Sequence, residues 1–196
     1  MKHNIVVSDG FDSSLFEELK SHPSFEVYPK AKLTQEELKD LLPKVNGLVV
    51  RSATKPNQEF VDAAPELKYI IRAGAGTDNI DKVYCQTKGV KVSNTPGANN
   101  NSAAEHAIAL MFTVLRKTAW ADASMQAGKW EKAKFMGSEL SQKTVGIVGF
   151  GQIGQIVAKR LAGFDCKVLF FDPFNKESDL SYATAASAIE EVFEKS

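Results

Sequence analysis

Short apolar runs alternate with amphipathic segments along the first hundred residues of the chain. The apolar runs predict strands, and the segments between them have the spacing of helices that pack by one face. Thr34 and Glu37 form a capping box for one helix, which Pro43 helps to end. Strands are expected at 5–7, 25–28, 47–50, 69–71 and 90–92, with helices at 13–20, 34–42 and 57–64 and a turn or helix at 79–88. This alternation predicts a parallel sheet covered on both faces.

A glycine-rich turn follows a later apolar run, 145–148, which is expected to be a strand buried on both faces. The turn reads Gly149-x-Gly151-x-x-Gly154 and opens a helix that is predicted to reach Leu161. Gly149 permits a tight turn, Gly151 lets the backbone approach a pyrophosphate, and Gly154 lets the helix pack closely on the strand. The amino end of the helix attracts phosphate. The pattern therefore predicts a dinucleotide site.

An acidic residue closes the next predicted strand, 167–171. This residue, Asp172, lies 18 positions after Gly154. A carboxylate there is placed to accept a hydrogen bond from the ribose 2′-hydroxyl of NAD and to repel the 2′-phosphate of NADP. No arginine follows in 173–175 to bind that phosphate. The sequence thus predicts NAD as the cofactor; a glycine turn without a ligand is the alternative.

Polar loops follow three strands of the predicted first sheet. Arg51 and Ser52 follow 47–50, Arg72 precedes the glycine loop 74–76, and a run of amides and hydroxyls occupies 93–101. Because the carboxyl ends of parallel strands meet at one edge, these loops are expected to lie together. Backbone N–H groups and guanidinium suit a carboxylate or phosphate. The alternative is that Arg51 and Arg72 are solvated loop residues and the glycines only make turns. Arg72, taken alone, is expected to form a structural ion pair.

Composition narrows the classes of function. The 196 residues are 43% hydrophobic and 24% charged, with a net charge of +0, so neither a nucleic acid nor a membrane is indicated as a partner. No apolar run approaches the roughly 18 residues of a membrane span. Cys85 and Cys166 are expected to be reduced, buried thiols of a cytoplasmic protein. No metal site is predicted.

A long helix is expected between the two strand-rich regions. Ser102 and Glu105 suggest a second capping box, and the helix is predicted to extend to about Gly128. Its residues 107–115 are apolar nearly all round, which is typical of a helix buried between layers. The basic, aromatic connector 128–137 is interpreted as a solvated loop, or alternatively as a source of lysines for an anionic ligand. A last helix is predicted at 184–195.

Taken together, these stretches resemble the D-2-hydroxyacid dehydrogenase family, most closely its phosphoglycerate-oxidising branch. The resemblance extends over nearly the whole chain in the family's order. It is carried by Leu48–Thr54, Arg72–Asn79, Asn94–Gly97, Ser102–Glu105, Gly128–Glu131, Lys134–Leu140 and the glycine turn. It implies a flavodoxin-like, parallel-sheet substrate domain over 1–98, then an interdomain helix and an incomplete Rossmann-type NAD-binding domain over 99–196.

The family also implies an activity, a partner and roles for the candidate residues. The activity is NAD-dependent oxidation of a D-2-hydroxy acid, most closely 3-phosphoglycerate to 3-phosphohydroxypyruvate in serine biosynthesis, by a homodimer or higher homo-oligomer. By this resemblance Arg51, Ser52, Gly74, Ala75, Gly76 and Asn99 bind substrate. Ala75, Gly149, Gly151, Gln152, Ile153, Gly154 and Asp172 bind the cofactor.

The family's catalytic arginine, glutamate and histidine have no counterpart in these 196 residues, so no residue is assigned a catalytic role. We therefore expect this chain to be a fragment of a longer dehydrogenase, and to be inactive by itself. The alternative is a non-catalytic NAD-sensing or protein-interaction module derived from the same family. The two alternatives differ in whether the reading frame continues into a segment with those three residues.

Overall fold

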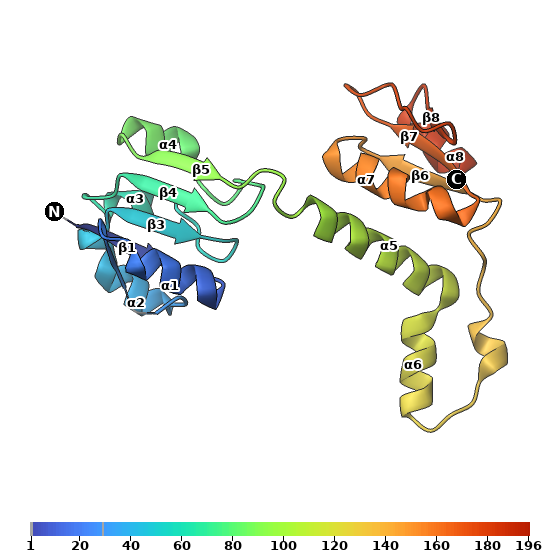
Figure 1. Cartoon of the computed structure of the whole chain (residues 1–196), viewed down its shortest axis with the longest axis horizontal. Helices are drawn as coiled ribbons and strands as arrows, with labels where there is room; N and C mark the ends of the chain where they lie inside the picture. Colours follow the sequence, from blue (N-terminus) through green and yellow to red (C-terminus); the bar gives the residue numbers. More distant parts are fainter. Residues whose placement is uncertain (1, 29) are drawn as a thin grey trace. The chain divides into compact units, whose positions relative to one another are not determined.

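The chain folds into two compact units that are divided between Ala98 and Asn99 (Figure 1). The computed structural model describes residues 2–28 and 30–196. Each unit has one parallel sheet with helices, so the predicted α/β class is confirmed.

The first unit contains a five-stranded parallel sheet in the order β2-β1-β3-β4-β5. This order is the flavodoxin-like one, in which the chain reverses direction across the sheet between β1 and β3. The strands are β1 (His3–Val7), β2 (Phe25–Val27), β3 (Gly47–Val50), β4 (Tyr69–Arg72) and β5 (Lys91–Asn94). The helices are α1 (Ser13–Ser21), α2 (Gln35–Leu41), η1 (Leu42–Lys44), α3 (Gln58–Asp62) and α4 (Lys82–Thr87). The predicted capping box at Thr34 and Glu37 is confirmed.

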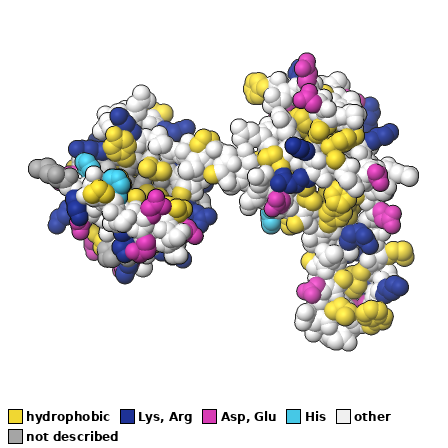
Figure 2. Space-filling view, viewed as in Figure 1, with side chains coloured by type: hydrophobic (Ala, Val, Ile, Leu, Met, Phe, Trp, Pro, Cys, Tyr) yellow, Lys and Arg dark blue, Asp and Glu magenta, His cyan; other side chains and the backbone are white. Residues whose placement is uncertain are grey.

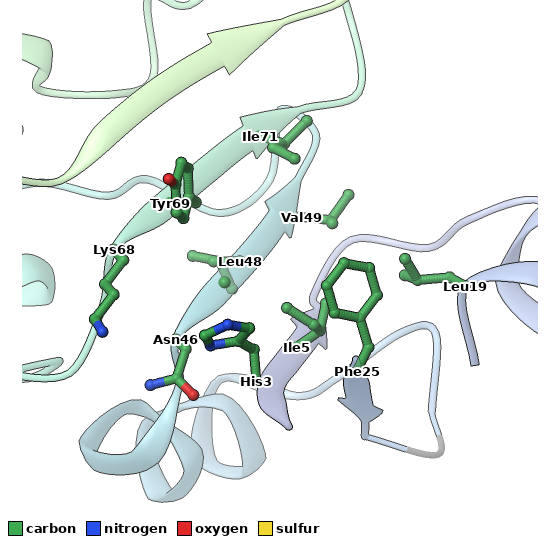
Figure 3. Close-up of a pocket in the computed structure, with 11 residues that line it drawn as sticks. His3, Ile5, Leu19, Phe25, Asn46, Leu48, Val49, Lys68, Tyr69 and Ile71 are labelled. Atoms are coloured by element: carbon green, nitrogen blue, oxygen red, sulfur yellow. The ribbon is translucent and has the colours of Figure 1, made fainter. Parts of the chain in front are cut away.

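Alternate strand residues of this sheet pack on opposite faces. Val6, Leu48 and Ile70 join a core with residues of α2, α3 and α4. Val7 and Val49 pack with Phe16 of α1 on the other face. That second face also has an apolar depression of about 230 Å³ between β1, β3 and β4 (Figure 3). The depression contains none of the predicted site residues, so it lies apart from the expected chemistry.

The second unit contains the three-stranded parallel sheet β6-β7-β8. Its strands are β6 (Thr144–Val148), β7 (Lys167–Phe171) and β8 (Ala183–Ala185). Its helices are α5 (Asn100–Arg116), α6 (Thr118–Gln126), η2 (Lys132–Phe135), α7 (Gln152–Arg160), η3 (Leu161–Phe164) and α8 (Ile189–Lys195). The core joins Phe150, Ala158 and Phe170 to the inner side of α5.

The long helix differs from its prediction in three ways. It begins at Asn100, with Asn99 as N-cap, so the capping box expected at Ser102 is wrong. It breaks at Lys117, whose φ of 54° lies in the left-handed region and separates α5 from α6. Burial within the chain is also smaller than expected: Ala104 is the buried residue of α5, and α6 has none among the described residues.

Two further expectations for the second unit are wrong. Residues 183–185 pair with β7 as a parallel strand, and the last helix begins only at Ile189. The run 145–148 is a strand, but it is not buried on both faces, because Val148 is 52% exposed on the outermost strand β6. Both differences follow from the pairing of the strands: 183–185 pairs with β7, and β6 has a neighbour on one side only in this sheet.

Two simpler expectations can also be compared with the structure. Cys85 and Cys166 are free and buried, as predicted. Within residues 2–28 and 30–196, no helix combines the length and the apolar character needed to cross a bilayer.

Candidate functional site

The carboxyl edge of the five-stranded sheet carries the loop Arg51–Thr54, directly after β3. The side chains of Arg51 and Ser52 are exposed, whereas Thr54 is buried. The loop is bound from both sides by residues of other strand ends, Asp9 after β1 and Asn79 after β4. Sequence reasoning missed both of these residues, although Asp9 follows the first strand as Arg51 follows the third.

Asp9 accepts hydrogen bonds from both ends of this loop. Its Oδ2 accepts from the N–H of Arg51 at 2.8 Å and from the N–H of Thr54 at 2.9 Å. Its Oδ1 accepts from the hydroxyls of Thr54 and Ser8. Burial raises the pKa of the Asp9 carboxyl, but the hydrogen bonds, those of Thr54 foremost, outweigh it and the pKa lies below its usual value. Asp9 is therefore ionised at neutral pH.

Asn79 binds the carbonyl groups of the same two loop residues. Its Nδ2 donates to the carbonyl oxygen of Arg51 at 2.8 Å and to that of Thr54 at 2.7 Å. Its Oδ1 is buried and has no donor within the described residues. The loop thus has fixed ends, and its middle residues, Ser52 and Ala53, are exposed.

The glycine loop after β4 is arranged around Arg72. A Cβ added at Gly74 would lie 2.8 Å from Nη1 of Arg72, and one added at Gly76 would lie 3.5 Å from it. The Gly74 N–H donates to the Arg72 carbonyl, so it is already used in this structure. Asn94 Nδ2 donates to the carbonyl of Ala75 at 2.5 Å. Ala75 and Gly76 retain the N–H groups that the sequence analysis assigned to substrate.

Arg72 does not form the ion pair that was expected of it. No salt bridge includes Arg72 in the described part of the chain, and its buried Nε has no hydrogen-bond partner there. The edge of this sheet therefore carries two arginines whose guanidinium groups form no salt bridge in the described part of the chain, although Asp78 Oδ1 and Arg72 Nη1 both lie close to Gly76. Such an edge favours an anion.

In the glycine turn of the second unit, each of the three positions requires or favours glycine for a different physical reason. Gly149 has φ 94°, a conformation that favours glycine. A Cβ added at Gly151 would meet open space. A Cβ added at Gly154 would lie 2.2 Å from the Gly149 carbonyl oxygen, so α7 approaches the turn more closely than any side chain would allow. The open space at Gly151 leaves the backbone accessible to a diphosphate.

Asp172 closes this turn from the end of β7. Its Oδ2 accepts from the N–H of Phe150 at 2.7 Å, and its Oδ1 accepts from Phe174 at 2.8 Å and Asn175 at 2.9 Å. The N–H groups of Asn175, Phe174 and Phe150 lower the pKa of the Asp172 carboxyl. Phe150 is held in addition by stacking on Phe170, with ring centroids 3.6 Å apart.

Side chains near the start of α5 form hydrogen bonds with residues at both ends of α7. Asn100 Nδ2 donates to Oε1 of Gln152 at 2.6 Å, and Arg160 donates to Asn101 and Glu105. Ile153 is 39% exposed beside Gln152. Asn99 caps no backbone N–H with its side chain, so its amide is available for other contacts. Asn99, the turn and Asp172 thus belong to the second unit, and Arg51, Ser52 and Gly74–Gly76 belong to the first.

A parallel sheet with a glycine turn opening a helix, and an aspartate at the next strand end, is the arrangement of dinucleotide-binding α/β proteins. A model of the family described as D-isomer specific 2-hydroxyacid dehydrogenase, catalytic domain, matches residues 5–195. The chain belongs to this family.

Relatives and solved structures agree with this assignment. The chain is 44% identical over 179 residues to the hydroxypyruvate reductase of Thermotoga maritima, covering 91% of this chain and 58% of that protein. It is 49% identical over 149 residues to the D-3-phosphoglycerate dehydrogenase of Archaeoglobus fulgidus, covering 76% of this chain and 28% of that protein. The NAD-dependent formate dehydrogenase of Staphylococcus aureus, solved in complex with NAD, aligns with a TM-score of 0.82 at 27% identity, over 100% of this chain and 63% of its own.

Proposed function

We propose that the protein containing this chain is an NAD-dependent dehydrogenase that oxidises 3-phosphoglycerate to 3-phosphohydroxypyruvate, the step of serine biosynthesis that the family resemblance implies. The observation that carries this proposal is the anion-favouring edge of the first sheet, where the guanidinium groups of Arg51 and Arg72 form no salt bridge among the described residues. Similar proteins named D-3-phosphoglycerate dehydrogenase support a phosphorylated substrate. The two buried thiols agree with a reducing, cytoplasmic setting.

NAD is the cofactor that the second unit fits. Gly149, Gly151 and Gly154, with the first N–H groups of α7, are proposed to bind the pyrophosphate, beside Gln152 and Ile153. Asp172 is proposed to accept from the adenosine ribose. When bound, the nicotinamide would take up the hydride that leaves the substrate. Ala75 and Gly76 are proposed to orient the substrate carboxylate through their N–H groups.

We further propose that these 196 residues do not turn over substrate alone. Oxidation of an alcohol needs a group that accepts the hydroxyl proton. The candidate substrate residues, Arg51, Ser52, Gly74–Gly76 and Asn99, include no carboxylate or imidazole that could take that role. A non-catalytic NAD-sensing module is the alternative, and turnover by the longest natural protein containing this chain distinguishes the two.

A substrate without phosphate is a second candidate. It is favoured by the 44% identity to a hydroxypyruvate reductase, which covers 91% of this chain. Hydroxypyruvate has a carboxylate but no phosphate, so Arg51 would lack the phosphate contact that is proposed for phosphoglycerate. The two candidates therefore differ in how much of the substrate affinity depends on this side chain.

Arg51→Ala in the full-length protein tests the choice. A charge-assisted hydrogen bond contributes about 1.5–3 kcal/mol, so KM for 3-phosphoglycerate should rise roughly 10- to 100-fold. Lys68→Ala is the matched control, because it removes one positive charge at the opposite end of the same sheet and should leave KM unchanged. An unchanged KM for phosphoglycerate in Arg51→Ala, with good turnover of hydroxypyruvate, would select the second candidate.

We also propose a homodimer or higher homo-oligomer. In its support, α6 and the connector after it expose large apolar side chains in the second unit, which Figure 2 shows in yellow. These side chains are Trp120, Met125, Trp130 and Met136. Exposed apolar groups of this size mark interaction surfaces. Light scattering of the protein, compared with a Trp120→Ser/Trp130→Ser variant, tests the oligomeric state.

A further inference from the structure

We propose that Asp9 and Asn79 are positioning residues that hold the loop Arg51–Thr54 in one backbone conformation, so that Arg51 is presented to the anionic group of the substrate. This inference rests on the proposed function of Arg51 and concerns two residues to which no role has been given so far. Neither residue needs to touch the substrate. Each acts through the backbone of the loop.

The backbone contacts of the loop are complete at its two ends. The N–H groups of Arg51 and Thr54 donate to one oxygen of Asp9, and the carbonyl groups of the same two residues accept from the amide of Asn79. All four distances lie between 2.7 and 2.9 Å. Two side chains, which follow the two strands on either side of β3, thus hold both residues by both of their polar backbone groups.

Asp9 has no capacity left for a ligand. A carboxylate offers about four acceptor positions. In Asp9, Oδ2 accepts the two backbone N–H groups, and Oδ1 accepts the hydroxyls of Ser8 and Thr54. Ser8 and Thr54 are themselves buried, with 3% of each exposed, so the aspartate is held from behind as well. Any hydrogen-bonding role of Asp9 toward a ligand is therefore indirect and passes through the loop.

The middle of the loop is left open. The N–H groups of Ser52 and Ala53 have no hydrogen-bond partner within the described residues, and both residues are exposed. The Arg51 side chain is exposed and forms no ion pair in that part of the chain. Free backbone N–H groups and a guanidinium both suit an anion. The fixed ends hold these donors in place before the substrate arrives.

The strand order makes this arrangement possible. In the order β2-β1-β3-β4-β5, β3 lies between β1 and β4. The residues after β1 and β4 therefore flank the loop after β3. Ligands of open parallel sheets bind outside the carboxyl ends of the strands, where the strand order reverses. Here that point is β1/β3, the position of Asp9 and Arg51.

The test uses Asp9→Ala, Asp9→Asn and Asn79→Ala in the full-length protein, with 3-phosphoglycerate as the probe. KM and kcat are measured together with the calorimetric dissociation constants of 3-phosphoglycerate and NAD. A displacement of about 1 Å costs as much as 100-fold. Asp9→Ala and Asn79→Ala should therefore raise KM and the phosphoglycerate dissociation constant about 10-fold or more, while kcat and NAD affinity change less than about 3-fold.

Asp9→Asn is expected to rescue most of this loss. Its amide oxygen can still accept both backbone N–H groups, while its NH₂ donates to the hydroxyls of Ser8 and Thr54. Asp12→Ala is the matched control. Asp12 caps α1 in the same unit through Ser14 and Leu15, so its loss lowers stability without reaching the loop. A purely structural role of Asp9 would resemble this control, with a smaller active fraction and an unchanged KM.

The outcomes separate this inference from the proposed function. If Arg51→Ala raises KM but Asp9→Ala and Asn79→Ala do not, the positioning role is wrong and the phosphate assignment stands. If Arg51→Ala leaves both KM and the dissociation constant unchanged, the phosphate assignment is wrong, and the inference is overturned with it. If Asp9→Ala does not fold, Asn79→Ala alone decides, because it leaves the carboxylate and its buried hydroxyls in place.

Discussion

Asp9 and Asp172 occupy equivalent places in the two units. Each follows a strand, and each accepts the N–H of a residue in the turn after the neighbouring strand, Arg51 for Asp9 and Phe150 for Asp172. Both carboxyls have a lowered pKa, the first because its hydrogen bonds outweigh burial and the second because of three N–H donors. In both sheets of this chain, an aspartate after one strand therefore accepts a hydrogen bond from the turn after the neighbouring strand.

The two carboxylates differ in the number of hydrogen-bond acceptor positions that remain free. Asp9 accepts four hydrogen bonds from the protein and is full, whereas Asp172 accepts three and has one place free on Oδ2. Asp9 is suited to hold a loop, and Asp172 to hold a turn and one hydroxyl of a ligand. The turns differ as well, because sterics restrict Gly149–Gly154 and hydrogen bonds restrict Arg51–Thr54.

The largest effect is expected from adding one methyl group to the sterically restricted turn. In Gly154→Ala the new Cβ meets a backbone carbonyl oxygen at 2.2 Å, so the second unit should lose about 3 kcal/mol or more of unfolding free energy. Gly74→Ala should cost less than about 1 kcal/mol, because the atom it meets is the mobile end of Arg72. Urea unfolding of both variants measures the difference.

Gly151→Ala is the control within the same turn, since its methyl group enters open space. It should unfold within about 1 kcal/mol of the original chain and nevertheless bind NAD less tightly. Equal unfolding free energies for Gly154→Ala and Gly74→Ala would show that the turns do not differ in this way.

A smaller effect is expected when the two aspartates lose their charge. Asp172→Asn should weaken NAD binding about 10-fold and reduce the preference for NAD over NADP, because the negative charge facing the ribose is gone. Asp9→Asn should leave both dissociation constants unchanged. Calorimetric titration of the two variants with NAD and NADP provides the measurement. If Asp172→Asn still prefers NAD over NADP to the same extent, the role proposed for Asp172 in choosing the cofactor is wrong.

The smallest effect is on the acid stability of the chain. The pKa of each carboxyl is lowered on folding, so each stabilises the folded state above its unfolded value of about 3.9. That contribution is lost as the pH falls through the lower, folded pKa. Asp9→Asn should therefore flatten the loss of stability below about pH 4. Urea midpoints measured across that range test this expectation, and an unchanged slope would contradict it.

Much of the fold could be predicted because its signals are local. The apolar runs of β1 to β7 and the capping box at Thr34 involve residues close together in the chain. The failures have non-local causes. Lys117 adopts a left-handed conformation, although no glycine or proline in the sequence indicates a break there. Residues 183–185 form a strand because they pair with β7, which is distant in the chain. The helix begins at the N-cap Asn99 and not at Ser102, three residues later, and local rules do not decide between them because both residue types are equally plausible N-caps.

The sequence by itself determined the order of strands and helices, the three glycines of the nucleotide turn and the supply of arginines at the strand ends. The tertiary structure decided which carboxylate closes which turn, and how many acceptor positions remain. Asp9 meets Arg51 across 42 positions, because β1 and β3 are neighbours although β2 comes between them in the chain. Hydrogen bonds of this kind depend on strand order, and strand order is set by how whole elements pack, which no single stretch of residues encodes.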